Sequence, residues 1–187
     1  MTKPILRDFP DQFETERLII RAPRVGDGKA MNEAILESLP QLAEWMYWAR
    51  QAPTLEESEE NIRRAVARFQ TREDLRLGLY LKDGTFAGGS GLHRPNWDVP
   101  SFEIGYWLRS SLCGKGYMTE AVAAITDFAF EHLGAKRVHI HADDRNVKSW
   151  RIPERLEFAL EGILRNDARD PHGGLRDTRI YAKTRSD

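Results

Sequence analysis

The sequence predicts an α/β fold in which a mixed sheet of about seven strands carries helices on both faces. Three observations lead to this prediction. Short β-branched and apolar runs of strand length alternate with longer segments of helical spacing. Strands and helices are mixed along the whole chain. The 187 residues also suffice for one compact domain, residues 1–187, with its own hydrophobic core.

The N-terminal part predicts one strand and two helices. Residues 16–22 form a short β-branched run that ends at a proline, which is typical of a strand. A helix is expected from Asp27, as its cap, to about residue 39. A second helix is expected to end near residue 72, because Thr54 and Glu57 have the spacing of a capping box.

The middle of the chain predicts a three-stranded meander followed by a helix. Its strands are expected at 75–81, 86–92 and 102–108, with an Asp-Gly hairpin turn between the first two. A glycine loop then leads into a helix that stops at Gly134, because its apolar residues recur at the spacing of one buried face.

The C-terminal part predicts a strand, a short helix and two closing strands. The strand is expected at 137–142 and the helix at 149–156, with Ser149 as its N-cap. The closing strands are expected at 158–164 and 178–182, separated by a loop that contains one proline and two glycines.

The composition limits the classes of partner and the compartment. The 28 basic and 29 acidic residues nearly balance, so we expect neither a nucleic-acid nor a membrane partner. The single cysteine, Cys113, excludes an internal disulfide and favours a reducing, cytoplasmic location. Residues 1–10 lack the apolar core of a signal peptide, and no stretch approaches membrane-spanning length.

The glycine loop, Gly114-Lys-Gly116, is the first candidate binding site. Unpaired N–H groups at the start of a helix can converge on an anion, and glycine allows close approach of the backbone. The loop has neither the Walker pattern nor the three glycines of a dinucleotide fingerprint. A pyrophosphate site and a plain glycine turn both remain open at this point.

The motifs taken together resemble the GNAT superfamily of acetyl-CoA-dependent N-acetyltransferases, and within it the RimJ/RimL-like branch of ribosomal-protein N-terminal acetyltransferases. The likeness covers nearly the whole chain and depends on the joint order and spacing of several short motifs. These are Thr15-Glu-Arg-Leu-Ile-Ile-Arg21, Leu42-x-x-Trp45-x-x-Trp48, Phe102-Glu-Ile-Gly-Tyr-Trp-Leu108, Gly114-Lys-Gly-Tyr-Met-Thr-Glu-Ala121, Asn146-x-x-Ser149, Arg155-Leu-x-Phe158 and Arg176-Asp-x-x-x-Tyr181.

The resemblance implies a mostly antiparallel acyl-CoA N-acyltransferase fold with acetyl-CoA as cosubstrate. The sheet should splay between the strand ending at Leu108 and the strand at Val138, with the pantetheine arm in the opening. The glycine loop should then hold the pyrophosphate. The implied cofactor residues are Trp107, Leu108, Leu112, Cys113, Gly114, Lys115, Gly116, Tyr117, Met118, Thr119, Asn146 and Ser149.

The resemblance also suggests catalytic residues. Glu103 is the first candidate for the base that takes the amine proton, with a salt-bridged strand glutamate as the alternative. His141, which alternates with His139 on one strand face, is the second, although a structural histidine is the simpler interpretation. Ser149 is the candidate proton donor to the CoA thiolate, with helix capping as the alternative. Cys113 is interpreted as a loop residue rather than a nucleophile.

The acceptor side is less defined by the sequence. Trp45 and Trp48 are candidates for the floor of an acceptor groove, although aromatic residues at helical spacing are more often core. The acceptor is expected to be a protein N-terminus, with a small amine or a non-catalytic acyl-CoA-binding module as alternatives. No metal is expected, and a homodimer is a further expectation. Two residues depart from the family pattern: Ser111 stands where arginine or glutamine is usual, and Glu157 stands where glycine is common, so that a left-handed conformation at Glu157 would cost about 1 kcal/mol.

Overall fold

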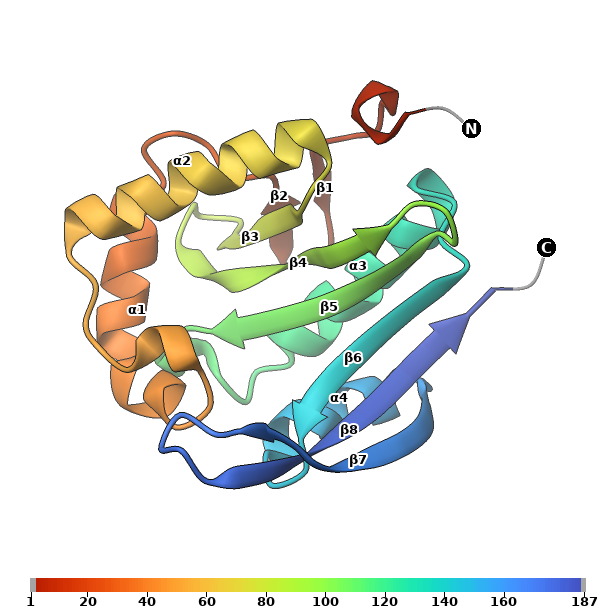
Figure 1. The fold of residues 1–187 in the computed structure, drawn as a ribbon. Coiled ribbons are helices and arrows are strands. Elements are labelled where there is room, and N and C mark those ends of the chain that lie inside the picture. Colours follow the sequence, from red (N-terminus) through yellow and green to blue (C-terminus); the bar gives the residue numbers. More distant parts are fainter. Residues whose placement is uncertain (1–2, 186–187) are drawn as a thin grey trace.

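The computed structural model describes residues 3–185 and contains one sheet with helices on both of its faces (Figure 1). The strands are β1 (Gln12–Glu14), β2 (Leu18–Arg21), β3 (Leu75–Leu81), β4 (Phe86–Asn96), β5 (Ser101–Leu108), β6 (Arg137–Asp143), β7 (Ala159–Arg169) and β8 (Leu175–Thr184). The α-helices are α1 (Gly28–Ala43), α2 (Leu55–Thr71), α3 (Tyr117–His132) and α4 (Val147–Arg155). Short 3-10 helices are η1 (Pro4–Leu6), η2 (Tyr47–Ala49) and η3 (Ser110–Leu112).

Within the described residues the sheet has eight strands in the order β1-β2-β3-β4-β5-β6-β8-β7. The pair of β5 and β6 is parallel, and the other neighbouring pairs are antiparallel. The mixed, mostly antiparallel sheet expected from the sequence is therefore confirmed. The strand that the sequence analysis did not find is β1, whose three residues are too few to show a periodic pattern.

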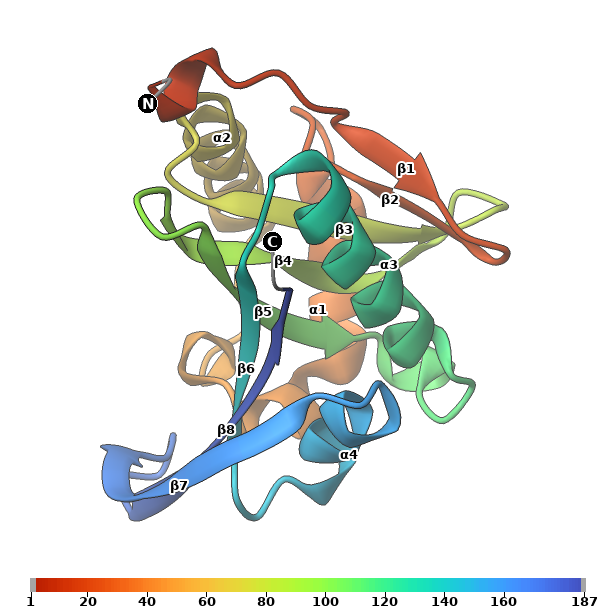
Figure 2. The same cartoon turned by 90° about the vertical axis from the view of Figure 1, so that its right-hand side faces the viewer.

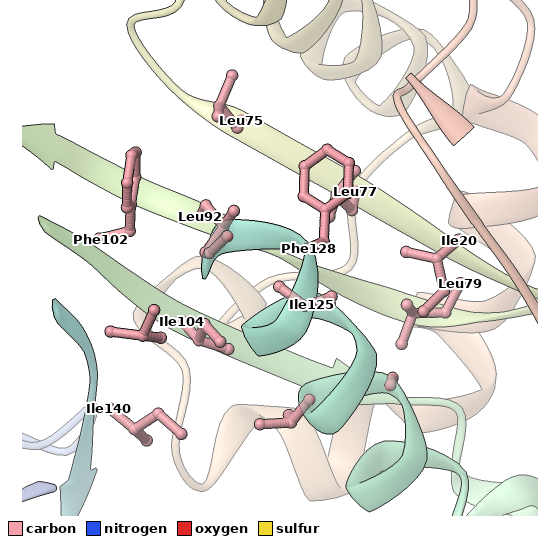
Figure 3. Close-up of a cluster of buried hydrophobic side chains, with 14 of the residues drawn as sticks. Ile20, Leu75, Leu77, Leu79, Leu92, Phe102, Ile104, Ile125, Phe128 and Ile140 are labelled. Atoms are coloured by element: carbon pink, nitrogen blue, oxygen red, sulfur yellow. The ribbon is translucent and has the colours of Figure 1, made fainter. Parts of the chain in front are cut away.

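The helices lie on the two faces of the sheet (Figure 2), and two hydrophobic cores hold them there. On one face α3 places Ile125 and Phe128 against apolar residues of the central strands, as Figure 3 shows. On the other face α1 and α2 place Met31 and Ile62 in a second cluster with Tyr80. The helical spacing read from the sequence therefore identified the buried faces correctly.

Three predicted boundaries were wrong, each for a local reason. The first helix continues to Ala43 with Pro40 inside it, since a proline removes one backbone hydrogen bond without always ending a helix. The last helix begins at Val147 rather than at Ser149. The closing hairpin extends through most of the predicted loop, and its turn is closed by Asp170, which donates its N–H to Gly174 O at 2.8 Å.

The two predicted helix caps differ in outcome. The capping box of Thr54 and Glu57 is present in full at the start of α2. Asp27 occupies the N-cap position of α1, but its side chain makes no capping bond. Its carboxylate instead pairs with Arg21 at 2.8 Å and accepts the N–H of Arg24 at 2.7 Å.

The parallel pair of β5 and β6 is short, and this creates an opening in the sheet. Pairing is confined to Ser101–Glu103 on β5 and Arg137–His139 on β6. Beyond these residues the two strands diverge, as Figure 1 shows. The splay implied by the family resemblance is thus present. Among residues 3–185, no helix has the length and apolar character required to cross a membrane.

Candidate active site

The glycine loop and the start of α3 form an anion-binding geometry beside the opening. Gly114 and Gly116 have φ of 77° and 82°, the left-handed region that favours glycine, and Gly116 is the N-cap of α3. The N–H groups of Tyr117, Met118 and Thr119 belong to the first helical turn, where no intrahelical acceptor exists. A side chain at Gly114 would meet nothing within 4 Å, so one side of the loop is open.

Arg17, the residue before β2, holds this loop against the sheet. It donates to Lys115 O at 2.9 Å, pairs with Glu120 at 2.6 Å and stacks over the Tyr117 ring at 4.5 Å. Burial opposes ionisation of Glu120, but hydrogen bonds from Thr15 and Arg17 outweigh it and keep its pKa below the ordinary value. The sequence analysis gave Arg17 no role; its place in the first motif was the available signal.

The start of α4 corrects one predicted role. Asn146, and not Ser149, caps this helix, because its Oδ1 accepts the N–H of Ser149 at 3.2 Å. Ser149 therefore lies inside the first turn, and its side chain is not used as a cap. Glu157 has φ of 59° and so does adopt the left-handed conformation, and Pro153 is accommodated within α4.

Tyr106 on β5 holds Ser149 from across the opening. Its hydroxyl donates to Ser149 O at 2.9 Å and accepts a hydrogen bond from Ser149 Oγ at 3.3 Å. Burial raises the pKa of Tyr106 to about 12, so the phenol is a neutral donor at physiological pH. The motif at the end of β5 contains Tyr106, but sequence spacing alone could not show that it reaches α4.

A cavity of about 650 Å³ lies between the sheet and the helices α1 and α2. Its aromatic wall includes Tyr80, Phe86, Trp107 and Trp48, and the Trp107 ring lies 5.8 Å from the rings of both Phe86 and Trp48. Gly89 is required beneath this wall, since an added Cβ would lie 2.6 Å from Trp107 Nε1. This aromatic pocket also includes Tyr106, which connects it to the opening.

The two tryptophans expected in an acceptor groove lie in different surroundings. Trp48 lines the aromatic pocket, whereas Trp45 is not among its lining residues. Tyr47 lies between them in sequence and donates its hydroxyl to Asp170 O at 2.8 Å. The segment between α1 and α2 is thereby joined to the turn between β7 and β8, and these two segments lie together in Figure 1.

Glu103 lies on the sheet face that carries the aromatic pocket, but it is outside the residues that line the pocket. Its Oε2 pairs with Arg94 at 2.7 Å and lies 3.8 Å from His139 Nε2 and 3.9 Å from His141 Nδ1. Both histidines are therefore grouped with Glu103. Burial and the neighbouring His141 lower the pKa of His139, which favours its neutral form.

A second candidate base, His93, was missed by the sequence analysis. His93 pairs with Glu103 across β4 and β5 and lines the aromatic pocket. Its Nδ1 lies 2.6 Å from Asp74 Oδ1, an arrangement that orients the ring and turns Nε2 away from the carboxylate. The pair depends on contact between two strands, so no local motif contains it.

The side chains predicted to bind cofactor occupy different surroundings. Those of Leu108, Leu112 and Met118 pack toward the α3 core, and the Trp107 side chain lies in the aromatic pocket on the opposite face. For these residues, a contact with acetyl-CoA is still predicted only through their backbone atoms. Cys113 is exposed in the loop.

Comparison with known proteins identifies the family. The model of an acetyltransferase (GNAT) domain matches residues 17–159. The chain belongs to the GNAT acetyltransferase family. This GNAT enzyme is 33% identical over 155 residues to "Putative ribosomal N-acetyltransferase YdaF" of Bacillus subtilis, a match that covers 81% of the chain and 82% of that relative.

Two solved structures share the fold of this GNAT protein. The microcin self-immunity acetyltransferase MccE, in complex with acetyl-CoA and AMP, superposes with a TM-score of 0.87 at 23% identity, covering 95% of this chain and 98% of that one. The ribosomal α-N-protein acetyltransferase RimL, in complex with coenzyme A, gives 0.85 at 20% identity, covering 91% and 95%. The predicted fold and enzyme class are thus confirmed.

The corrected cap leads to a prediction for α4. Asn146→Ala removes the capping oxygen and should lower the free energy of unfolding by about 1 kcal/mol. Ser149→Ala, the matched control in the same turn, retains the cap and should change that free energy much less. Urea unfolding of both variants measures the difference. Equal destabilisation would contradict the assignment of the cap to Asn146.

Proposed function

We propose that this enzyme transfers an acetyl group from acetyl-CoA to the N-terminal α-amine of a protein. The observation that carries the proposal is the position of Tyr106. It lines the aromatic pocket and at the same time contacts Ser149 on the far side of the opening between β5 and β6. An amine in the pocket and a thioester in the opening would meet beside this residue.

The residues around the opening fit acetyl-CoA. The unpaired N–H groups at the start of α3 would hold the pyrophosphate, with the charge of Lys115 nearby. The edges of β5 and β6 beyond Glu103 and His139 have no mutual pairing, so their backbone groups are available to the amides of a pantetheine arm. Asn146, the N-cap of α4, would contact the far part of this arm. When bound, acetyl-CoA supplies the activated acetyl group as a thioester.

The proposed reaction needs three contributions from the chain. The amine nitrogen attacks the thioester carbon, so a C–N bond forms while the C–S bond breaks. Backbone N–H groups on the open edge of β5 would stabilise the oxyanion. The departing thiolate would take a proton from Ser149 Oγ, which would regain one from solvent, and the amine would give its proton to a base. Tyr106 positions Ser149 and stays neutral throughout, because burial raises its pKa to about 12.

Glu103 is the proposed base, acting directly or through water from the rim of the pocket. The demand on it is modest: an α-amine of pKa about 8 needs only about 1.4 kcal/mol to be neutral at pH 7, whereas a lysine side chain needs about 5 kcal/mol. Glu103 and Gly105 are two residues apart on β5 and therefore share one strand face. Because Gly105 lines the pocket, Glu103 lies near the proposed acceptor.

The role of Glu103 is tested by Glu103→Gln, which keeps the shape and removes the base. We expect kcat to fall by about 10²-fold or more, with little change in acetyl-CoA affinity. Glu161→Gln, which removes an ion-paired carboxylate on β7, is the matched control and should retain wild-type kcat. Wild-type turnover of Glu103→Gln across pH would remove Glu103 from the mechanism. His93→Gln would then test the pocket histidine.

The acceptor is proposed from the pocket and from the relative. The aromatic pocket can hold the first side chain of a peptide whose amine reaches Tyr106. The similarity to a relative named as a ribosomal N-acetyltransferase supports a protein terminus rather than a small amine. A small-molecule amine remains the alternative outcome of the acceptor experiment.

That experiment measures CoA thiol release with acetyl-CoA and a panel of amines. The panel contains peptides with free or blocked N-termini, lysine side chains, polyamines and aminoglycosides. We expect release only with free peptide N-termini. Release with polyamines or aminoglycosides alone would contradict a protein acceptor. If no amine in the panel causes thiol release while acetyl-CoA still binds, the result would instead support a non-catalytic module.

A further inference from the structure

Glu103, His139 and His141 form a compact cluster on the sheet face that carries the aromatic pocket. The two histidines are separated by one residue on β6 and therefore point to the same side of the strand. Glu103 reaches them from β5, exactly where the parallel pairing with β6 ends. One possible ligand atom from each of the three side chains lies within 4.8 Å of the other two.

The donor set is that of a zinc-type site. Two imidazoles and one carboxylate bind Zn²⁺ in many proteins and leave a fourth coordination position open. Metal–ligand bonds of about 2.0–2.1 Å require ligand atoms to be about 3.4 Å apart in a tetrahedral site. The observed separations from Glu103 Oε2, 3.8 Å and 3.9 Å, need only a small adjustment of side chains that are all partly exposed.

The state of the histidines supports this interpretation. Among residues 3–185, His139 Nδ1 is buried and finds no hydrogen-bond partner, so no hydrogen bond at that atom fixes the orientation of the ring. A buried histidine used only for structure would normally have this nitrogen hydrogen-bonded.

Arg94 is the competitor for this site. It donates to Glu103 Oε2 at 2.7 Å, and its side chain is 76% exposed. An ion pair with so exposed a cation contributes little and can be broken easily. Arg94 follows His93, where the β4–β5 register shifts, and has φ of 48°. The irregular backbone thus directs the Arg94 side chain toward the Glu103 carboxylate, in a contact that a metal ion could displace.

We propose that Glu103, His139 and His141 bind a divalent transition metal of the Zn²⁺ type, in competition with Arg94. This site was not expected from the sequence, because Glu103 is separated from the histidines by more than thirty residues and meets them only in the sheet. Binding does not depend on the proposed function. Its consequence does: a metal on Glu103 would occupy the proposed base and inhibit acetyl transfer.

The binding experiment uses protein without a polyhistidine tag and the metals alone. Co²⁺ is added while its visible absorption is recorded, and Zn²⁺ affinity is measured by competition with a chromophoric chelator. We expect one equivalent to bind. His141→Ala should weaken binding by roughly tenfold or more, since it removes a ligand, whereas His172→Ala in the exposed β7–β8 turn should leave it unchanged. Arg94→Gln should tighten it.

The outcomes separate the metal site from the enzyme mechanism. Failure of the wild type to bind Co²⁺ or Zn²⁺, or binding that survives in both His139→Ala and His141→Ala, would overturn the proposal. When binding is found, acetyl transfer is measured with and without Zn²⁺. Inhibition that His141→Ala relieves supports both proposals. Stoichiometric binding without inhibition supports the metal site and contradicts Glu103 as the base.

Discussion

The site depends on how few residues pair between β5 and β6. A continuous sheet would satisfy the backbone groups of both strands and leave no entrance between them. Here the parallel ladder ends at Glu103 and His139, while β4 and β8 continue to hold the outer edges of the two strands. The strands can therefore separate without unfolding, and the opening exposes backbone donors and acceptors at the centre of the fold.

The opening has two functional sides because β5 alternates its side chains. Tyr106 faces toward α4 and contacts Ser149, whereas Trp107, the next residue, belongs to the aromatic pocket beneath α1 and α2. One strand thus contributes to both the proposed cofactor side and the proposed acceptor side. Arg17, directly before β2, anchors the glycine loop, so the same sheet also positions the start of α3.

Much of this architecture could be predicted from the sequence because its signals are local. Helical spacing identified α3, and the Thr54 and Glu57 capping box identified the start of α2. The order of motifs identified the family. The three-residue strand β1 lacked enough residues for a pattern. The choice between Asn146 and Ser149 as the cap was also beyond local reasoning, since both residue types cap helices well.

The contacts within the site were harder to predict, since they join distant segments. The approach of Tyr106 to Ser149, the pair of Asp74 and His93, and the meeting of Glu103 with His139 each require the register of the sheet. Local motifs provided the residue types without their partners. The roles assigned to these residues accordingly remain proposals, while the fold and the family are established.

The most direct test of this account is backbone hydrogen exchange with and without acetyl-CoA. The account predicts slower exchange at two places: the amides of residues 104–108 and 140–143, which edge the opening, and residues 114–119, at the start of α3. Exchange in α1 and α2 should change little. Protection confined to the aromatic pocket, with the opening and the glycine loop unaffected, would contradict the proposed placement of the cofactor.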